Sequence, residues 1–200
     1  MSLLLKAGLG FVGLAGVSGA GYLGLRKFSE APKESFKSKY SLAINGFLSN
    51  DATLDKKLTA LSVDSTNPRH LDLLNAKKHK KDNKDADAKE SLKKGCLDIH
   101  NKALDSGFFE DFKNFCSFNN GDKIDASKSV VTENGDFTNK KDTFNGKTSD
   151  QLQKGFKEIA KPSGTSPDTK WQEAMLSECK RLALEIFEGE IPNFKEFCTK

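Results

Sequence analysis

Apolar and polar residues are distributed very unevenly along the chain. The 19 residues 7–25 are uncharged and consist mainly of glycine, alanine and leucine, whereas the remainder is strongly polar. This length is close to the ~20 residues that a helix needs to cross the hydrocarbon core of a membrane. Lys6 precedes the segment and Arg26-Lys27 follows it. The pattern predicts that residues 7–25 contact a lipid bilayer, as a transmembrane helix or as a signal peptide.

Small residues recur within this segment at a spacing of four. Gly16, Ala20 and Gly24 fall on one face of a helix, and such a stripe lets two membrane helices approach closely. Simple apolar filler is the favoured interpretation of these small residues, and a helix-packing face with self-association is the alternative that the spacing allows. The stretch also spells G-x-G-x-x-G from Gly8 to Gly13. No buried strand precedes it, so a dinucleotide-binding loop is not predicted.

Short predicted elements follow the hydrophobic segment. Residues 28–50 contain Pro32 and scattered serine, lysine and glutamate, which predicts a juxtamembrane linker. A short helix is predicted over residues 53–61, because Asn50 or Asp51 can supply its N-cap.

The next helix is predicted to begin after Pro68. Leu71 and Leu74 form its apolar stripe, with Lys78 further along the same face. The basic run of residues 77–81 is diluted by nearby acids, which is typical of a solvated helix face rather than of a polyanion-binding site.

Two longer helices carry the clearest stripes. The first is predicted over residues 86–104 and ends before Gly107, and the second begins at Ser166-Pro167 and ends at Gly189. Between them lie a polar connector, residues 119–148, and a predicted helix over residues 150–161. The two stripes are Ala88, Leu92, Cys96, Ile99 and Ala103, and Trp171, Met175, Cys179, Leu182 and Ile186.

Two ten-residue segments resemble each other. Residues 107–116, GFFEDFKNFC, align without a gap on residues 189–198, GEIPNFKEFC, and five of the ten positions are identical. Another cysteine precedes each segment within a predicted helix, Cys96 in one case and Cys179 in the other. The four cysteines thus form two equivalent pairs, which predicts a duplicated helical-hairpin module with a period of 82 to 83 residues.

Helix geometry brings the cysteines of each module together. A helix rises about 16 Å from Cys96 to Gly107, and a returning helix descends about 13 Å to Cys116. The same arithmetic applies to Cys179 and Cys198, so disulfides Cys96–Cys116 and Cys179–Cys198 are predicted. Closing a loop of about 20 residues contributes roughly 3 kcal/mol.

Two alternatives for the cysteines stay open. In the first they pack as free thiols on the apolar stripes, and in the second they bind a metal, since Cys96 and His100 lie one helical turn apart. The second module has no histidine and the chain has no C-x-x-C motif, so no metal site is predicted. Persistent disulfides imply an oxidising, extracytoplasmic setting.

The predicted fold class is mostly α. An N-terminal hydrophobic helix is followed by two small repeated helical-hairpin modules with a polar connector. The predicted domains are residues 1–27, a transmembrane helix or signal peptide; 28–50, a juxtamembrane linker; 51–118, the first helical module; 119–148, a polar linker; and 149–200, the second helical module.

Composition excludes several classes of function. The formal net charge is only +4 and lysine far outnumbers arginine, so no nucleic-acid partner is predicted. The histidines lie only in the first half of the chain, and the two modules therefore cannot share a Cys-His mechanism. No catalytic residues and no cofactor are predicted, and we do not expect an enzyme.

The chain resembles a family at both ends. The opening K-A-G-L-G…G-Y-L, the Trp171-Gln172-Glu173 start of a cysteine-containing helix and the closing F-K-x-F-C are similar to the large paralogous families of uncharacterised membrane and surface proteins of hemotropic mycoplasmas. The resemblance implies a surface-antigen or host-interaction role. It implies no catalytic residues, because none are defined in these families.

Two functional hypotheses follow. The first is a single-pass, membrane-anchored protein whose C-terminal region is extracellular, acting as an antigen or host-interaction protein with an extracellular protein partner. It would be secreted if the segment were cleaved near Ser18-Gly19-Ala20. The second is a membrane-anchored, cytoplasmic-facing binding module with reduced cysteines, which the positive charges after residue 25 favour.

Overall fold

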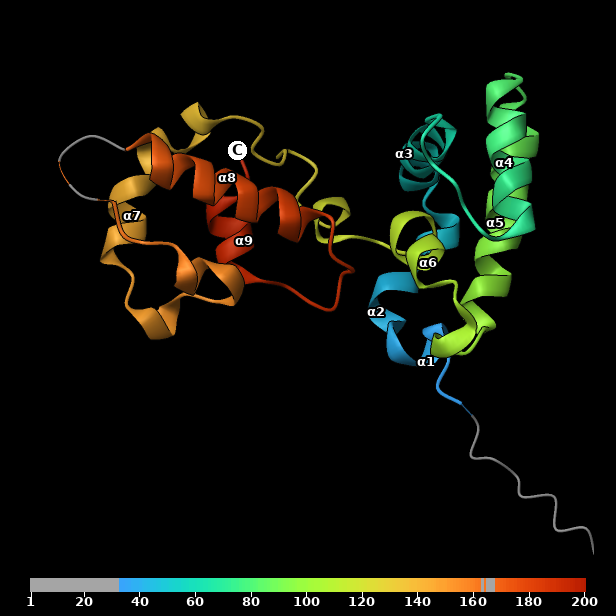
Figure 1. The fold of residues 1–200 in the computed structure, drawn as a ribbon, viewed down its shortest axis with the longest axis horizontal. Helices are drawn as coiled ribbons and strands as arrows, with labels where there is room; N and C mark the ends of the chain where they lie inside the picture. The colour runs from blue at the N-terminus through green and yellow to red at the C-terminus, as the bar shows by residue number, and fades with distance from the viewer. Residues whose placement is uncertain (1–32, 163, 165–167) are drawn as a thin grey trace, which may run out of the picture. The chain divides into compact units, whose positions relative to one another are not determined.

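The computed structural model describes residues 33–162, 164 and 168–200 (Figure 1). Contacts between residues divide the chain into two units, residues 1–32 and 33–200, and the second is described here. The predicted membrane segment lies outside the described residues, together with its Gly16, Ala20 and Gly24 stripe. Within the part that is described, no helix combines the length and apolar character needed to cross a membrane.

The described residues are mostly helical and contain isolated β-bridges instead of strands. The α-helices are α1 (Phe36–Lys39), α2 (Ser41–Ile44), α3 (Asp51–Ser62), α4 (Leu71–Lys81), α5 (Asp85–Asn101), α6 (Phe109–Phe115), α7 (Lys141–Gly146), α8 (Thr169–Ala183) and α9 (Pro192–Phe197). Short 3-10 helices join them: η1 (Phe47–Ser49), η2 (Leu104–Ser106), η3 (Asn120–Asp122), η4 (Asn134–Lys140), η5 (Ser149–Gln151) and η6 (Lys154–Glu158).

The first hydrophobic core forms between α1 and α6. We call it the first core; it comprises the buried apolar residues from Phe36 to Phe118, joined by Ile186. The segment expected as a linker, residues 28–50, supplies several of its members. Phe36 and Phe47 are fully buried there, because the short helices α1, α2 and η1 fold back against α5 and α6.

Helix α3 begins two residues before the predicted start, and Asn50, one of the two expected N-caps, accepts a hydrogen bond from the backbone N–H of Thr53. The predicted face of α4 is wrong. Leu71 and Leu74 are exposed, and Leu73 and Ala76 are buried instead. Both pairs are spaced by three residues, so periodicity alone could not choose between the two faces.

Helix α5 ends earlier than the sequence indicates. It stops at Asn101, and the chain then runs extended so that Lys102 pairs with the start of α1. Gly107 has a φ of 80° and follows the 3-10 turn η2 rather than α5 itself. A left-handed conformation there suits glycine, which carries no Cβ, and it turns the chain into α6.

The second hydrophobic core gathers residues from 131 to 198, and we call it the second core. The segment 119–148, expected as a polar linker, contributes to it Val131, Phe137 and Phe144, all buried. These few apolar residues are spread among asparagine, glycine and lysine residues. The composition of the segment is therefore polar, although part of the segment is buried.

Two further expectations in this half are corrected. The stretch 150–161 forms the 3-10 helices η5 and η6, not one α-helix, and Phe156 is buried. Helix α8 begins after Asp168, whose carboxylate accepts a hydrogen bond from the backbone N–H of Trp171. It ends at Ala183, so Ile186 lies beyond it and packs in the first core.

Candidate functional site

The structure brings the four cysteines together in two pairs. Cys96 on α5 bonds to Cys116 at the end of α6, with Cα atoms 4.9 Å apart. Cys179 on α8 bonds to Cys198 at the end of α9, with Cα atoms 5.2 Å apart. All four residues are fully buried, and each bond closes a loop over a helical hairpin.

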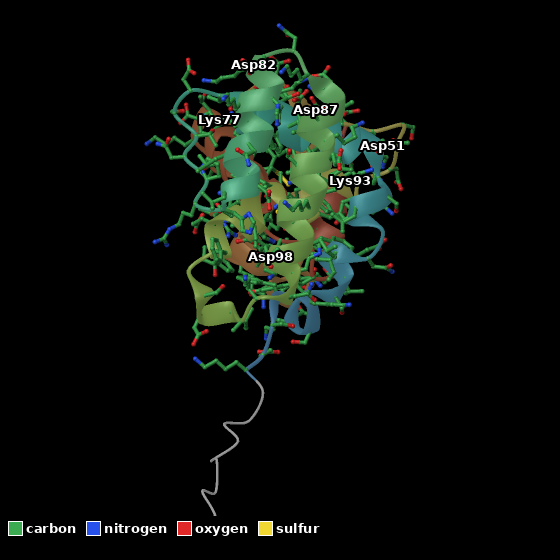
Figure 2. All side chains as sticks on the ribbon, turned by 90° about the vertical axis from the view of Figure 1, so that its right-hand side faces the viewer. Asp51, Lys77, Asp82, Asp87, Lys93 and Asp98 are labelled. Atoms are coloured by element: carbon green, nitrogen blue, oxygen red, sulfur yellow. A yellow bond between two sulfur atoms is a disulfide. The ribbon has the colours of Figure 1, made fainter. Side chains whose placement is uncertain are left out.

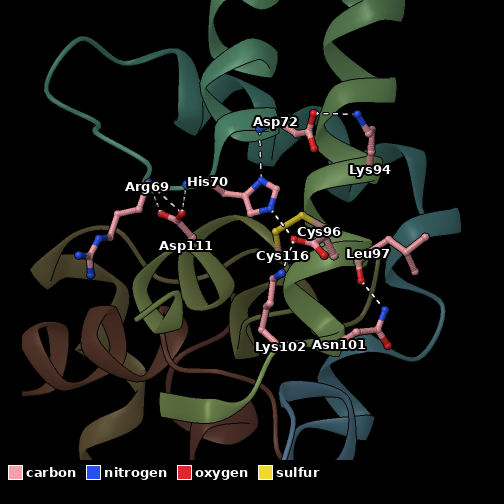
Figure 3. A network of polar contacts seen from close by, with 11 residues as sticks. Arg69, His70, Asp72, Lys94, Cys96, Leu97, Asn101, Lys102, Asp111 and Cys116 are labelled. Atoms are coloured by element: carbon pink, nitrogen blue, oxygen red, sulfur yellow. Dashed lines mark hydrogen bonds and ion pairs between the residues drawn. A yellow bond between two sulfur atoms is a disulfide. The ribbon is translucent and has the colours of Figure 1, made fainter. Parts of the chain in front are cut away.

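A polar network lies beside the first of these bonds (Figure 3). Asp111 on α6 is buried, and one oxygen of its carboxylate accepts hydrogen bonds of 2.8 Å from the backbone N–H groups of Arg69 and His70. These N–H groups lie at the start of α4, where helical partners are missing. The Arg69 guanidinium donates a further bond of 3.0 Å to the carbonyl of Gly107. Asp111 therefore ties the start of α4 to α6.

His70 uses both of its ring nitrogens in this network. Its Nδ1 accepts a hydrogen bond of 3.2 Å from the backbone N–H of Asp72, and its Nε2 donates one of 2.8 Å to Asp98. Lys102 lies 3.2 Å from the same carboxylate. Bonds from His70 and Lys102 lower the pKa of Asp98 below its ordinary value. With both nitrogens engaged, His70 caps α4 and has no free position for general-base chemistry.

Similar contacts recur 82 to 83 residues later with different side chains. The carbonyl of the buried Asn193 side chain accepts a hydrogen bond of 2.7 Å from the backbone N–H of Gln153, as Asp111 does from His70. Glu178 accepts a bond of 3.0 Å from the backbone N–H of Gly155. The sequence carried a signal for the first of these, because both acceptors directly precede the F-K-x-F-C motif.

The backbone pairs at the edge of each core also correspond. In the first core, Phe36 donates to Lys102 and Leu104 donates to Glu34. At the edge of the second, the backbone N–H groups of Asn120 and Phe187 donate to the carbonyls of Glu185 and Phe118, at 3.0 and 2.9 Å. The hydrogen bonds of the second core join the segment after α6 to the segment after α8, and we call this connection the crossing. It brings Ile186 onto the first core.

A buried lysine stabilises this crossing. Lys57 on α3 lies 3.1 Å from the carboxylate of Asp122 and also donates to the side-chain carbonyl of Asn119. Burial lowers the pKa of Lys57, and the charge of Asp122 opposes that effect. The amide of Asn119 donates to the carbonyls of Lys113 and Leu184, at 3.1 and 3.0 Å. The crossing is therefore held by polar groups whose hydrogen bonds are satisfied.

Two open clefts flank the crossing. One, of about 470 Å³, includes Tyr40, Phe109 and Glu188. The other, of about 570 Å³, includes Lys56 and Asn114. Charges of both signs line each, and within the described ranges no cluster of side chains is arranged to hold a metal ion.

Comparisons of the chain with protein-family models, with curated protein sequences and with solved structures find no match.

Proposed function

We propose that residues 34–200 are two tandem copies of one disulfide-closed helical module. The first module would span residues 34–117 and the second residues 118–200, each longer than the cysteine hairpins visible in the sequence. Buried residues support this, because those of one core correspond to those of the other at a spacing of 82 to 84 residues. The pairs include Phe47 and Val131, Leu54 and Phe137, Leu61 and Phe144, Leu73 and Phe156, Ala88 and Trp171, Leu92 and Met175, Ile99 and Leu182, Phe112 and Phe194, and Phe115 and Phe197.

We further propose that these modules form the extracytoplasmic part of a surface-exposed interaction or antigen protein without enzymatic activity. In this proposal residues 7–25 engage the bilayer, as an anchor or as a segment that is cleaved. The resemblance to paralogous surface proteins of hemotropic mycoplasmas agrees with such a role.

The observation that carries the proposal is the pairing of all four cysteines, with no thiol left free. Stable disulfides persist in oxidising compartments and are rare in a reducing cytoplasm. Small cores also gain most from cross-links, since each loop contributes roughly 3 kcal/mol to stability.

The polar network supports a structural role for its residues. The side chains that resemble catalytic groups, His70 with Asp98 and Asp111, satisfy backbone N–H groups or one another. A different pair of side chains serves similar backbone groups in the second module, which is expected of caps and not of a shared reaction centre.

Thiol accounting combined with surface proteolysis tests the proposal. Protein from the native membrane is denatured and alkylated without reduction, so that any free thiol is accessible, and intact cells are separately treated with a protease. We expect no alkylated cysteine and loss of the region after residue 33. Four alkylated cysteines and a protected C-terminal region would instead support a cytoplasmic-facing module and overturn the proposal.

A further inference from the structure

The first module contains a buried lysine. Figure 2 shows charged side chains of α4 and α5 at the surface, among them Lys93, whose side chain is 40% exposed. The side chain of Lys57 on α3 is only 7% exposed, and it lies 3.1 Å from the carboxylate of Asp122. A buried ion pair often adds little net stability, so stability alone does not explain why a lysine occupies this place.

The amine of Lys57 contacts two side chains of the crossing. It donates a hydrogen bond to the side-chain oxygen Oδ1 of Asn119 and lies 3.1 Å from Oδ2 of Asp122. The same Oδ2 accepts a hydrogen bond of 3.0 Å from the backbone N–H of Asn119. The fold thus holds an amine, an amide and a carboxylate together, although Lys57 and Asn119 are 62 positions apart.

The amide of Asn119 is held in one orientation. Its Nδ2 donates to the backbone carbonyls of Lys113 and Leu184, at 3.1 and 3.0 Å. Only the nitrogen of an amide donates hydrogen bonds, so these two acceptors turn Oδ1 toward Lys57. The carbonyl carbon Cγ is bonded to Oδ1 at about 1.2 Å, and it therefore lies next to the amine.

The surroundings of Lys57 favour its action as a nucleophile. An amine attacks a carbonyl carbon only in its neutral form, and desolvation favours this form. Burial lowers the pKa of Lys57, and the charge of Lys56 on the same helix acts in the same direction. The charge of Asp122 opposes these effects, but its carboxylate can accept the proton that the amine must lose.

We propose that Lys57 and Asn119 join through an amide bond between their side chains, with Asp122 as the proton-transfer group. The ammonium of Lys57 gives one proton to Asp122, and Nζ attacks Cγ while the electron pair of the C=O bond moves to Oδ1. A second proton passes from Nζ to Nδ2 through the carboxyl group. The Cγ–Nδ2 bond breaks, the carbonyl re-forms, and ammonia leaves as ammonium with the proton held by Asp122.

The reaction exchanges one amide for another and consumes no oxidant, reductant or water. The cleft of about 570 Å³ beside the crossing includes Lys57, Asn119 and Asp122, and it gives the ammonia a way out. The hydrogen bonds described for the crossing, and the stability that they contribute, are those of the chain before the bond forms. The proposal does not depend on where the protein resides in the cell.

The second module provides a comparison. The residue 83 positions after Lys57 is Lys140, and burial lowers its pKa as well. Its Nζ donates to the backbone carbonyls of Glu196 and Thr199, at 3.2 and 2.9 Å. Attack on either carbonyl would cut the chain. Burial of a lysine is therefore common to both modules, and the side-chain amide is what distinguishes Lys57.

The amide bond closes a loop from residue 57 to residue 119. This loop contains both Cys96 and Cys116, so it surrounds the first disulfide in the sequence. A reductant opens the disulfide but does not cleave an amide. The bond therefore keeps α3 joined to the segment after α6 when the disulfide is reduced.

Peptide mapping of the full chain tests the proposal. The protein is purified in detergent, reduced, alkylated and digested with trypsin. We expect residues 57–69 and 114–123 as one joined species, lighter than the two separate peptides by one ammonia, with no cleavage after Lys57. A succinimide at the Asn-Gly pair of residues 120 and 121 also loses ammonia, but it leaves the peptides separate. Separate peptides without any joined species would overturn the proposal.

Variants assign the roles of the three groups. Lys57→Arg should abolish the joined species, because a guanidinium stays charged. Asp122→Asn keeps the size of the side chain and loses the proton acceptor, so pulse-labelled chains should form the joined species roughly 100-fold more slowly. Asp122→Glu should restore it. The matched control Lys140→Arg changes the corresponding lysine of the second module and should leave the joined species unchanged.

Tryptophan fluorescence and disulfide pairing show which variants fold. A folded Asp122→Asn chain that forms the joined species at the wild-type rate would contradict the assignment of proton transfer to Asp122. The same species in Lys57→Arg would show that the bond does not involve Lys57 and would overturn the proposal.

Discussion

At the scale of residues, buried hydrogen-bond acceptors hold the start of α4. Removing Asp111 leaves the backbone N–H groups of Arg69 and His70 unsatisfied in a buried place. We expect Asp111→Ala to lower the free energy of unfolding by about 2–3 kcal/mol, measured by urea denaturation. Asp111→Asn should cost about 1 kcal/mol, because Asn193 performs the matching role with one carbonyl. Equal losses in the two variants would show that the acceptor is unimportant.

His100 should make stability depend on pH. Its Nε2 donates to the carbonyl of Cys116, and burial lowers the pKa of the ring below 6.5. The unfolded chain therefore binds the proton more readily, and stability should fall as the pH drops from 7 to 5. His100→Gln, which can keep the donor, should flatten this part of the profile in urea titrations.

The carboxylate of Asp98 acts in a separate window. Its lowered pKa stabilises the fold above about pH 4, and this contribution is lost only at lower pH. A pH profile between 5 and 7 that is the same in His100→Gln and in the wild type would therefore contradict the assignment to His100.

At the scale of elements, close approach of α4 and α5 depends on Gly95. A Cβ atom there would lie 3.1 Å from Cβ of Asp72 and 3.2 Å from a methyl group of Leu73. Valine should force the helices apart, and we expect Gly95→Val to cost about 2 kcal/mol in thermal or urea unfolding. Asp87→Val, on an exposed turn of the same helix, should change stability by less than about 0.5 kcal/mol.

The periodicity of apolar residues predicted the long helices that bury a single face. The stripes around Cys96 and Cys179 mark α5 and α8, because these helices each bury one face, but the last predicted members, Ala103 and Ile186, lie beyond the helix ends. It chose the wrong face of α4, where two leucines point to solvent. It also missed that residues 119–148 are packed, since Phe137 and Phe144 lie in short helices without enough turns to show a period.

The candidate site was less accessible from the sequence. Cysteine spacing indicated both pairs, because helix rise converts sequence separation into distance. The contact between Lys57 and Asn119 joins residues 62 positions apart and depends on how two cores meet. No local sequence pattern predicts how the two cores pack against each other. In addition, a lysine in a helix ordinarily indicates an exposed position.

At the scale of the whole molecule, Asn119 couples the two cores. Its substitution by alanine removes one acceptor of Lys57, which keeps only Asp122, and removes the amide that donates to the carbonyls of Lys113 and Leu184. We expect Asn119→Ala to cost about 2–3 kcal/mol and to separate two unfolding transitions. Trp171 is the single tryptophan and lies in the second core, so its fluorescence reports that core while circular dichroism reports both.

A matched control distinguishes coupling from simple destabilisation. Asn101 is exposed and bonds only within its own helix, to the carbonyl of Leu97. Asn101→Ala should leave the two probes coincident. Coincident probes in Asn119→Ala as well would show that the cores unfold together without this residue.

The burial of the four sulfur atoms has a kinetic consequence. Because Cys96, Cys116, Cys179 and Cys198 are fully shielded, a small reductant reaches them only when a hairpin opens. The rate of reduction at saturating reductant then equals the rate of opening, separately for each pair. The reduction rate of each disulfide would thus report the opening rate of its own hairpin, one in each half of the described chain.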